Sequence, residues 1–305
     1  MKNKALKRLN YGLSALLVCF SLFSFKLVPT VKKDTIANNN GFKLKTIIVD
    51  AGHGGTPTGT GHFSHGASGS YSTERGVTLA IALKLQKAIE KELTDTKVVL
   101  TRSTEDDVSW ERRSAIANEN KGNLFISLHC NSLADRVVRE VVGHKHHKPV
   151  YKTVRIANHS GKGVLVLVYG LKRTREEEKA IKQNQLEEGE GDDAEMNSGL
   201  DPNDPESIIL INQYKSKFRQ QSIHLANLIN TEFVETDGRP SEGIREQGVL
   251  VLCHSAMPAV LVETGYINNL DDEAYLNSEK GQDEIVSSIV RALKNYKDEV
   301  EQVAK

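Results

Sequence analysis

The chain has 305 residues, of which 38% are hydrophobic and 26% charged, the composition of an ordinary soluble globular protein. Its 40 basic and 40 acidic residues cancel, so charge gives no reason to expect nucleic-acid binding. This length allows one large domain or two small ones.

The first 42 residues indicate export. Several basic residues near the start precede an apolar stretch over residues 11–25, which is the order found in a secretory signal. The stretch is short for a membrane span, which needs roughly 20 residues, yet no small-residue cleavage site follows it. Residues 1–28 are therefore predicted to be a signal peptide or an N-terminal anchor, and residues 29–42 a linker. Either interpretation places the protein in the periplasm or cell envelope.

Three short runs rich in β-branched residues are predicted to be buried strands of one sheet: residues 45–50, 123–129 and 259–263. His53 follows the glycine turn after the first run, and His129 and Glu263 end the second and third. In open α/β sheets, chemistry gathers at the carboxyl ends of the strands. We therefore expect these three side chains at one edge of the sheet.

Glu74 is predicted to begin a helix, where a carboxylate often does no more than complement the helix dipole. Each histidine taken alone is commonly a solvated or satisfied polar group. Together, His53, Glu74 and His129 supply two imidazoles and one carboxylate, which fill three tetrahedral positions and leave one for water. They are candidate ligands of one zinc ion, and Glu263 is the candidate carboxylate that takes the proton from the water.

A long insertion is predicted between the second and third strands, over about residues 134–206. Its expected parts, in chain order, are a basic hairpin at 136–158, a strand at 163–169, an acidic mobile segment at 175–204 and a long helix beginning near Pro205. The histidines at 144, 146 and 147 could bind metal, but the pattern favours a solvated hairpin tip.

Five blocks of the sequence resemble the zinc-dependent N-acetylmuramoyl-L-alanine amidases of bacterial cell walls: IIVDAGHGG, ERGVTLAIALKLQKAIE, KVVLTRSTEDDVSWERRSAIAN, LFISLHCNS and MPAVLVETGYINNLDDEAYL. The resemblance runs from about Lys45 to about Tyr296. It implies a single α/β domain over residues 43–297, with a mixed, largely parallel sheet flanked by helices, and a tail at 298–305. The first glycine-rich loop departs from the family pattern through an extension that carries His62 and His65.

The same resemblance implies zinc held by His53, Glu74 and His129, with Glu263 catalytic. The implied reaction is hydrolysis of the amide between N-acetylmuramic acid and L-alanine of the peptidoglycan stem peptide, in wall remodelling or daughter-cell separation. Two rivals stay open: a zinc peptidase acting within the stem peptide, and a non-catalytic wall-binding protein.

Three further predictions concern residues outside the metal group. Arg245 either grips carboxylates of the stem peptide or forms a surface ion pair. Glu206, in the first turn of the helix at Pro205, either complements the dipole or occupies the open metal position as an autoinhibitory ligand that a protein activator removes. Cys130 and Cys253 are expected to be buried thiols, with a disulfide between them as the alternative.

Overall fold

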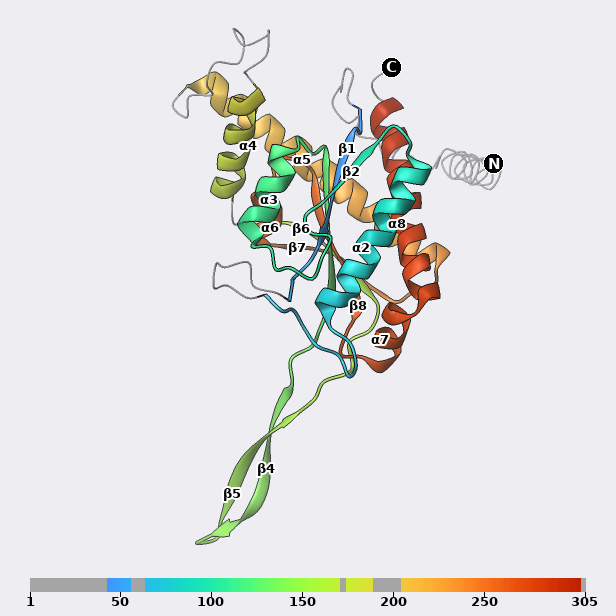
Figure 1. Cartoon of the computed structure of the whole chain (residues 1–305). Helices are drawn as coiled ribbons and strands as arrows, with labels where there is room; N and C mark the ends of the chain where they lie inside the picture. Colours follow the sequence, from blue (N-terminus) through green and yellow to red (C-terminus); the bar gives the residue numbers. More distant parts are fainter. Residues whose placement is uncertain (1–42, 56–63, 171–173, 189–203, 303–305) are drawn as a thin grey trace, which may run out of the picture. The chain divides into compact units, whose positions relative to one another are not determined.

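The fold is taken from a computed structural model, which describes residues 43–55, 64–170, 174–188 and 204–302 (Figure 1). These residues all belong to one compact unit. The expected signal peptide or anchor, the linker and His62 lie outside the described residues. Within these ranges, no helix combines the length and apolar character needed to cross a bilayer.

The core element is a six-stranded sheet in the order β2-β1-β3-β8-β6-β7. The strands are β1 (Thr46–Ala51), β2 (Lys97–Leu100), β3 (Leu124–Asn131), β6 (Val164–Tyr169), β7 (Ser241–Gln247) and β8 (Ala259–Tyr266). All neighbouring pairs are parallel except β6 with β8. The prediction of a mixed, largely parallel sheet is therefore confirmed.

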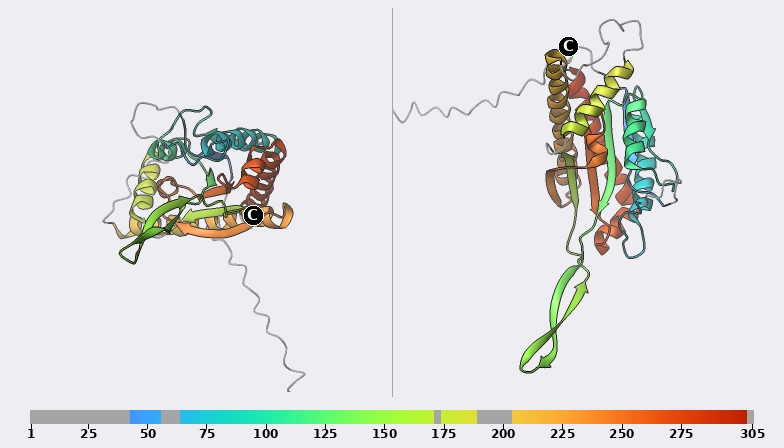
Figure 2. Two further views of the ribbon diagram at one scale, coloured as in Figure 1. Left: turned by 90° about the horizontal axis from the view of Figure 1, so that it is seen from below. Right: turned by 90° about the vertical axis from the view of Figure 1, so that its left-hand side faces the viewer.

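Helices cover both faces of this sheet (Figure 2). On one face α2 (Glu74–Glu92), α5 (Pro205–Thr231) and α8 (Glu279–Gln302) pack on the larger hydrophobic cluster. On the other face lie α3 (Trp110–Glu119), α4 (Thr174–Glu188) and α6 (Leu250–Cys253). Two short elements, η2 (Glu232–Thr236) and α7 (Leu270–Asn277), connect the layers.

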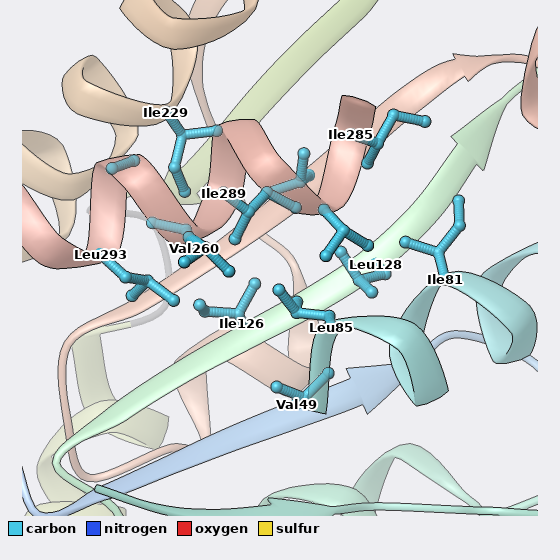
Figure 3. Close-up of a cluster of buried hydrophobic side chains, with 14 of the residues drawn as sticks. Val49, Ile81, Leu85, Ile126, Leu128, Ile229, Val260, Ile285, Ile289 and Leu293 are labelled. Carbon is cyan, nitrogen blue, oxygen red and sulfur yellow. The ribbon is translucent and has the colours of Figure 1, made fainter. Parts of the chain in front are cut away.

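The larger cluster forms because apolar residues recur at helical spacing on these helices and at alternate positions of the central strands, so that both sets meet on one face of the sheet. Figure 3 shows Leu85 of α2 and Ile289 of α8 directed toward Ile126 of β3 and Val260 of β8. All four side chains are fully buried.

Two features of the predicted domain organisation differ in the structure. Helix α8 continues to Gln302, so most of the expected tail is helical, because Val300 extends the apolar spacing of Leu293 and Tyr296 and is buried with them. The strand expected at 163–169 is present as β6, but it joins the central sheet between β8 and β7. The region between β3 and β8 is therefore not a mere insertion.

The acidic segment is only partly as predicted. Instead of being mobile throughout, it begins with α4, because Ala180 and Ile181 give that helix an apolar stripe that is buried with Ala256 and packed by Tyr214 and Phe218. Residues 189–203 lie outside the described part.

The basic hairpin is present as β4 (Arg136–Lys145) and β5 (Lys148–Ile156). The two strands pair only with each other in a separate two-stranded sheet. The turn between them carries His146 and His147, both with positive φ, and His144 is exposed like its neighbours. The hairpin-tip interpretation of these histidines is therefore confirmed.

Candidate metal centre

The parallel register of the sheet brings the predicted residues together. His129 of β3 lies directly beside Glu263 of β8. Both strands continue beyond these residues, to Asn131 and Tyr266, so the two side chains stand within the strands near their carboxyl ends. His53 follows the end of β1, the strand on the other side of β3.

His53 is held in an unusual backbone conformation. Its φ is 59°, in the left-handed region that non-glycine residues rarely adopt. Its Nδ1 lies 2.6 Å from the hydroxyl oxygen and 3.1 Å from the carbonyl oxygen of Ser64. This leaves Nε2 directed toward Glu74, at 3.2 Å from Oε1. The neighbouring Gly52 lets the loop approach β3, because a Cβ there would lie 2.5 Å from Nε2 of His129.

Glu74 begins α2, but its side chain turns inward and is buried. Its Oε1 lies 3.0 Å from Nδ1 of His129 and accepts a hydrogen bond from the Cys130 backbone N–H at 3.0 Å. Its Oε2 accepts one from the Ala67 N–H at 2.7 Å. The carboxylate therefore bridges the two imidazoles instead of only complementing the helix dipole.

One donor atom from each of His53, Glu74 and His129 lies within 4.8 Å of the others. Within the described ranges this is the only such group of three or more histidine, cysteine or acidic side chains. Two imidazoles and a carboxylate are a donor set that suits zinc. The geometry of the chain therefore fits a bound metal ion at this point.

The charges at the centre are strongly coupled. Burial alone would raise the pKa of Glu74, but the contacts with His129 and His53 outweigh it and hold this pKa well below its usual range. Burial works to lower the pKa of His129, while the hydrogen bond to Glu74 and the charge of Glu263 raise it overall. Glu74 is thus an ionised carboxylate, the form that binds metal.

Glu263 differs from Glu74 in having an unused oxygen. Its Oε2 is buried and has no hydrogen-bond partner among the described residues. Burial raises the pKa of Glu263 to about 7, against the charge of His129, which lowers it. A buried carboxylate oxygen without a partner calls for an explanation, such as a ligand or a reacting group.

Arg113 of α3 reaches beneath the centre and fixes the chain there. Its guanidinium pairs with Asp50 at 2.7 Å and donates to the carbonyl oxygens of Ala51 at 2.6 Å and His53 at 2.8 Å. Asp50 also accepts hydrogen bonds from the hydroxyl of Ser127. The sequence reasoning missed this arginine, although an aspartate and a serine within apolar strands were a signal of a buried polar network.

A second arginine holds the same loop from the other side. Arg102 donates from Nε to the carbonyl oxygen of Ala51 at 2.8 Å and from Nη2 to that of Gly52 at 2.9 Å. The consecutive carbonyls of residues 51–53 are therefore all bonded to buried guanidinium groups. These bonds support the left-handed conformation of His53.

The remaining predicted residues lie apart from the metal group. Arg245 of β7 pairs with Glu242 at 2.5 Å, and 58% of its side chain is exposed. The register pairs Arg245 of β7 with Leu167 of β6, and Leu167 with Leu261 of β8. Leu261 and Glu263 are two residues apart on β8 and point to the same face. Arg245 therefore lies on the same face of the sheet as Glu263, two strands away. Its role in binding substrate stays a prediction. Nδ1 of His65 contacts Arg75 Nη1 at 3.0 Å.

The prediction that Glu206 occupies the open metal position is wrong, because the amino-terminal end of α5, which carries Glu206, points away from the metal group. The Ser222 hydroxyl of α5 accepts a hydrogen bond from the first residue of β8, Ala259. Glu206 stands 16 residues before Ser222, about 24 Å further from the centre along a helix. It is exposed at the edge opposite the metal group, so it cannot serve as an autoinhibitory ligand.

Cys130 and Cys253 are both buried, and no disulfide joins them. The expectation of buried thiols is confirmed, and the alternative of a disulfide between them is not what the structure shows.

The fold is an α/β domain, and its donor set could hold a metal ion. A sequence model described as N-acetylmuramoyl-L-alanine amidase matches residues 47–295. The chain therefore belongs to this family, and the resemblance found in its sequence is confirmed.

Several known proteins are similar to the chain. A probable cell wall amidase, LytH, of Staphylococcus epidermidis is 25% identical over 266 residues, which is 87% of this chain but only 63% of that protein. A putative N-acetylmuramoyl-L-alanine amidase of Buchnera aphidicola is 29% identical over 255 residues, covering 82% of this chain and 95% of its own. The catalytic domain of CwlV from Bacillus (Paenibacillus) polymyxa has a TM-score of 0.53 at 23% identity, covering 83% of this chain and 98% of that chain. This likeness confirms the fold class.

Proposed function

We propose that this protein is a zinc-dependent hydrolase that cleaves the amide between N-acetylmuramic acid and L-alanine in peptidoglycan. Membership of the amidase family supports the bond that is cleaved. The observation that carries the proposal is the clustering of His53, Glu74 and His129 beside Glu263, whose Oε2 lacks a partner.

The residues that would hold zinc are His53, Glu74 and His129. Ser64 holds Nδ1 of His53, which leaves Nε2 for the metal, as expected when a second partner orients a metal-binding imidazole. Bound zinc would supply Lewis acidity at the scissile carbonyl, which makes an amide carbonyl a better electrophile.

Glu263 is the proposed proton carrier. It neighbours His129 across the strand pair, so a water attacking beside the metal group would lie within its reach. Its Oε2 would accept a proton from that water and deliver it to the nitrogen that leaves as the amine. The first transfer strengthens the nucleophile, and the second turns a poor leaving group into a good one.

Arg245 is proposed to bind a carboxylate of the stem peptide, because it lies on the face of Glu263 with an exposed guanidinium. Replacing it by alanine should raise KM more than it lowers kcat. An unchanged KM would mean that Arg245 does not bind substrate and only forms the surface ion pair with Glu242.

We also propose export to the periplasm or cell envelope, through residues 1–28 as a signal peptide or anchor. Within the exported chain the catalytic domain would span residues 43–302. Wall remodelling or daughter-cell separation is the corresponding role. With Glu206 excluded as a lid, a protein activator would have to act through some other feature of the domain.

The test is digestion of purified peptidoglycan, followed by mass spectrometry of the products. Wild type should release intact stem peptides that begin with L-alanine, and glycan that retains its lactyl groups. Glu263→Gln should bind zinc and lose turnover by several orders of magnitude, since it keeps the shape of the side chain without a basic oxygen. Peptide fragments cut within the stem would show that the protein is a zinc peptidase instead. Binding to the wall without any products would show that it is a non-catalytic wall-binding protein.

A further inference from the structure

We propose that the β4–β5 hairpin, residues 136–156, is a second contact surface for the polymeric substrate. It would bind the carboxylate-bearing peptides of a peptidoglycan strand whose scissile amide lies at the metal centre. This inference rests on the proposed function.

The hairpin is anchored at the rim of the metal centre. Its first strand follows closely on β3, which carries His129. At its base, the Asn268 side chain donates to the carbonyl oxygens of Leu133 and Asn158, on the two legs of the hairpin, at 2.9 and 3.0 Å. Asn268 itself lies just beyond β8, the strand of Glu263. Figures 1 and 2 show the hairpin leaving the domain at this end of the sheet.

The hairpin is strongly basic in a chain whose net charge is zero. Its only acidic residue is Glu140, against six basic residues: Arg136, Arg139, Lys145, Lys148, Lys152 and Arg155. Within the described structure none of these six forms an ion pair. Six cations outside any ion pair suit a polymer that presents carboxylates repeatedly.

The hairpin also exposes apolar surface. Of the eleven exposed large hydrophobic side chains in the described residues, six lie on it: Val137, Val141, Val142, Val150, Tyr151 and Ile156. Val141 and Tyr151 are cross-strand partners and therefore share one face. Tyr151 is 57% exposed and could pack its ring against a sugar, while neighbouring cations hold the peptides.

A free two-stranded hairpin is marginally stable in water, and its unpaired outer edges and apolar side chains are features that proteins usually cover. A second copy of the chain is a poor occupant, because two hairpins of the same charge repel. Peptidoglycan is a better one, because its stem peptides carry free carboxylates and it must already lie at the rim where the hairpin begins. With 10 residues in β4, the hairpin extends this contact by about 30 Å.

The test separates polymer binding from catalysis. In the reversed variant, Arg139, Lys148 and Arg155 are replaced by glutamate, and in a milder variant by glutamine. The matched control reverses three exposed lysines elsewhere, Lys87, Lys91 and Lys280, which changes net charge equally. Thermal unfolding of each variant checks that the domain is intact.

Binding is measured by co-sedimentation of zinc-free protein with isolated peptidoglycan at several salt concentrations. We expect the reversed variant to bind at least tenfold more weakly, the glutamine variant to fall between, and the control to match wild type. The binding that remains in the reversed variant should no longer depend on salt concentration. Equal binding by reversed variant and wild type, or an equal loss in the control, would overturn the proposal.

Kinetics supply the second readout. On intact peptidoglycan kcat/KM should fall at least tenfold in the reversed variant, while on a soluble disaccharide-peptide it should not change. An equal fall on both substrates would assign the hairpin to the metal centre's own integrity and refute a separate polymer contact. If the variant loses binding to phosphatidylglycerol vesicles but keeps binding to peptidoglycan, the occupant is a lipid surface and the proposal fails. Hairpin-dependent binding without any hydrolysis by wild type would refute the proposed function, but not the contact between the hairpin and peptidoglycan.

Discussion

Replacing Arg113 by alanine should be among the most damaging single changes outside the metal group. Its side chain is 6% exposed and that of its partner Asp50 only 1%. Burial raises the pKa of Asp50, but the charge of Arg113 and the hydroxyls of Ser127 and Thr101 outweigh it and hold this pKa below its usual value. Asp50 is thus a buried anion that depends on its partner.

The expected magnitude follows from what is left behind. Arg113→Ala removes the countercharge of Asp50 and the donors to the carbonyl oxygens of Val108, Ala51 and His53. Removing one partner of a buried ion pair typically costs about 3–5 kcal/mol. We expect the free energy of unfolding to fall by about that amount at pH 7. Only the ionised form of Asp50 needs the countercharge of the arginine. The difference in unfolding free energy between wild type and Arg113→Ala should therefore shrink as the pH falls and Asp50 becomes protonated.

Urea denaturation of the zinc-free protein measures this loss without interference from metal binding. Arg113→Lys should fall between wild type and Arg113→Ala, because an ammonium keeps the charge but cannot match the planar array of donors. The double variant Asp50→Asn with Arg113→Met should lose less than the two single changes added together, because it leaves no buried charge unpaired. A loss below about 1 kcal/mol for Arg113→Ala would refute the account of this network.

Two further predictions concern other parts of the domain. Burial raises the pKa of Glu177 in α4 from 4.5 to about 7, so the folded state loses stability as the pH rises from 4.5 past 7. In thermal or urea unfolding, Glu177→Gln should therefore be more stable than wild type by up to about 3 kcal/mol at pH 8 and equal to it at pH 4. A variant less stable than wild type at pH 8 would contradict this. At Gly66, where φ is +70°, a Cβ would lie 2.6 Å from Glu74 Oε2, so Gly66→Ala should weaken zinc binding at least tenfold in competition with a chelator. Gly238→Ala is the matched control, because Gly238 has φ +65° and open space around its Cβ position; equal zinc affinities in the two variants would show that Gly66 does not shape the site.

The sheet edge could be predicted because two simple regularities coincide there. Short runs rich in β-branched residues mark buried strands, and parallel pairing aligns the ends of such strands. These regularities are enough to place His53, His129 and Glu263 together. Glu74 was harder to assign from its own position, because a carboxylate in a first helical turn has a sufficient explanation in the helix dipole.

The rest depends on long-range packing that local patterns do not contain. Arg113 lies 63 residues from Asp50, and nothing in its helical spacing shows that it turns toward β1. The acidic composition of α4 concealed the pair Ala180 and Ile181, which suffices to bury one side of a helix against α5. Composition averaged over a segment is a poor guide when two residues decide its packing.

The error over Glu206 has a geometric cause. The sequence correctly indicates a helix beginning near Pro205, with a carboxylate in its first turn. It does not indicate which end of the helix meets the site. Because α5 has 27 residues, its two ends are about 40 Å apart, and it is the carboxyl-terminal end that leads back to β7 at the metal-bearing edge.

The central claim is that one zinc ion, held by His53, Glu74 and His129, makes this chain an amidase. The most direct measurement is a titration of metal-free protein with zinc, in which release of stem peptides beginning with L-alanine from peptidoglycan is followed by mass spectrometry. Activity should rise from zero and reach its plateau at one equivalent of zinc in wild type, and His129→Ala should stay inactive and bind no stoichiometric zinc. Full activity in the metal-free protein, or full zinc occupancy in His129→Ala, would contradict the account.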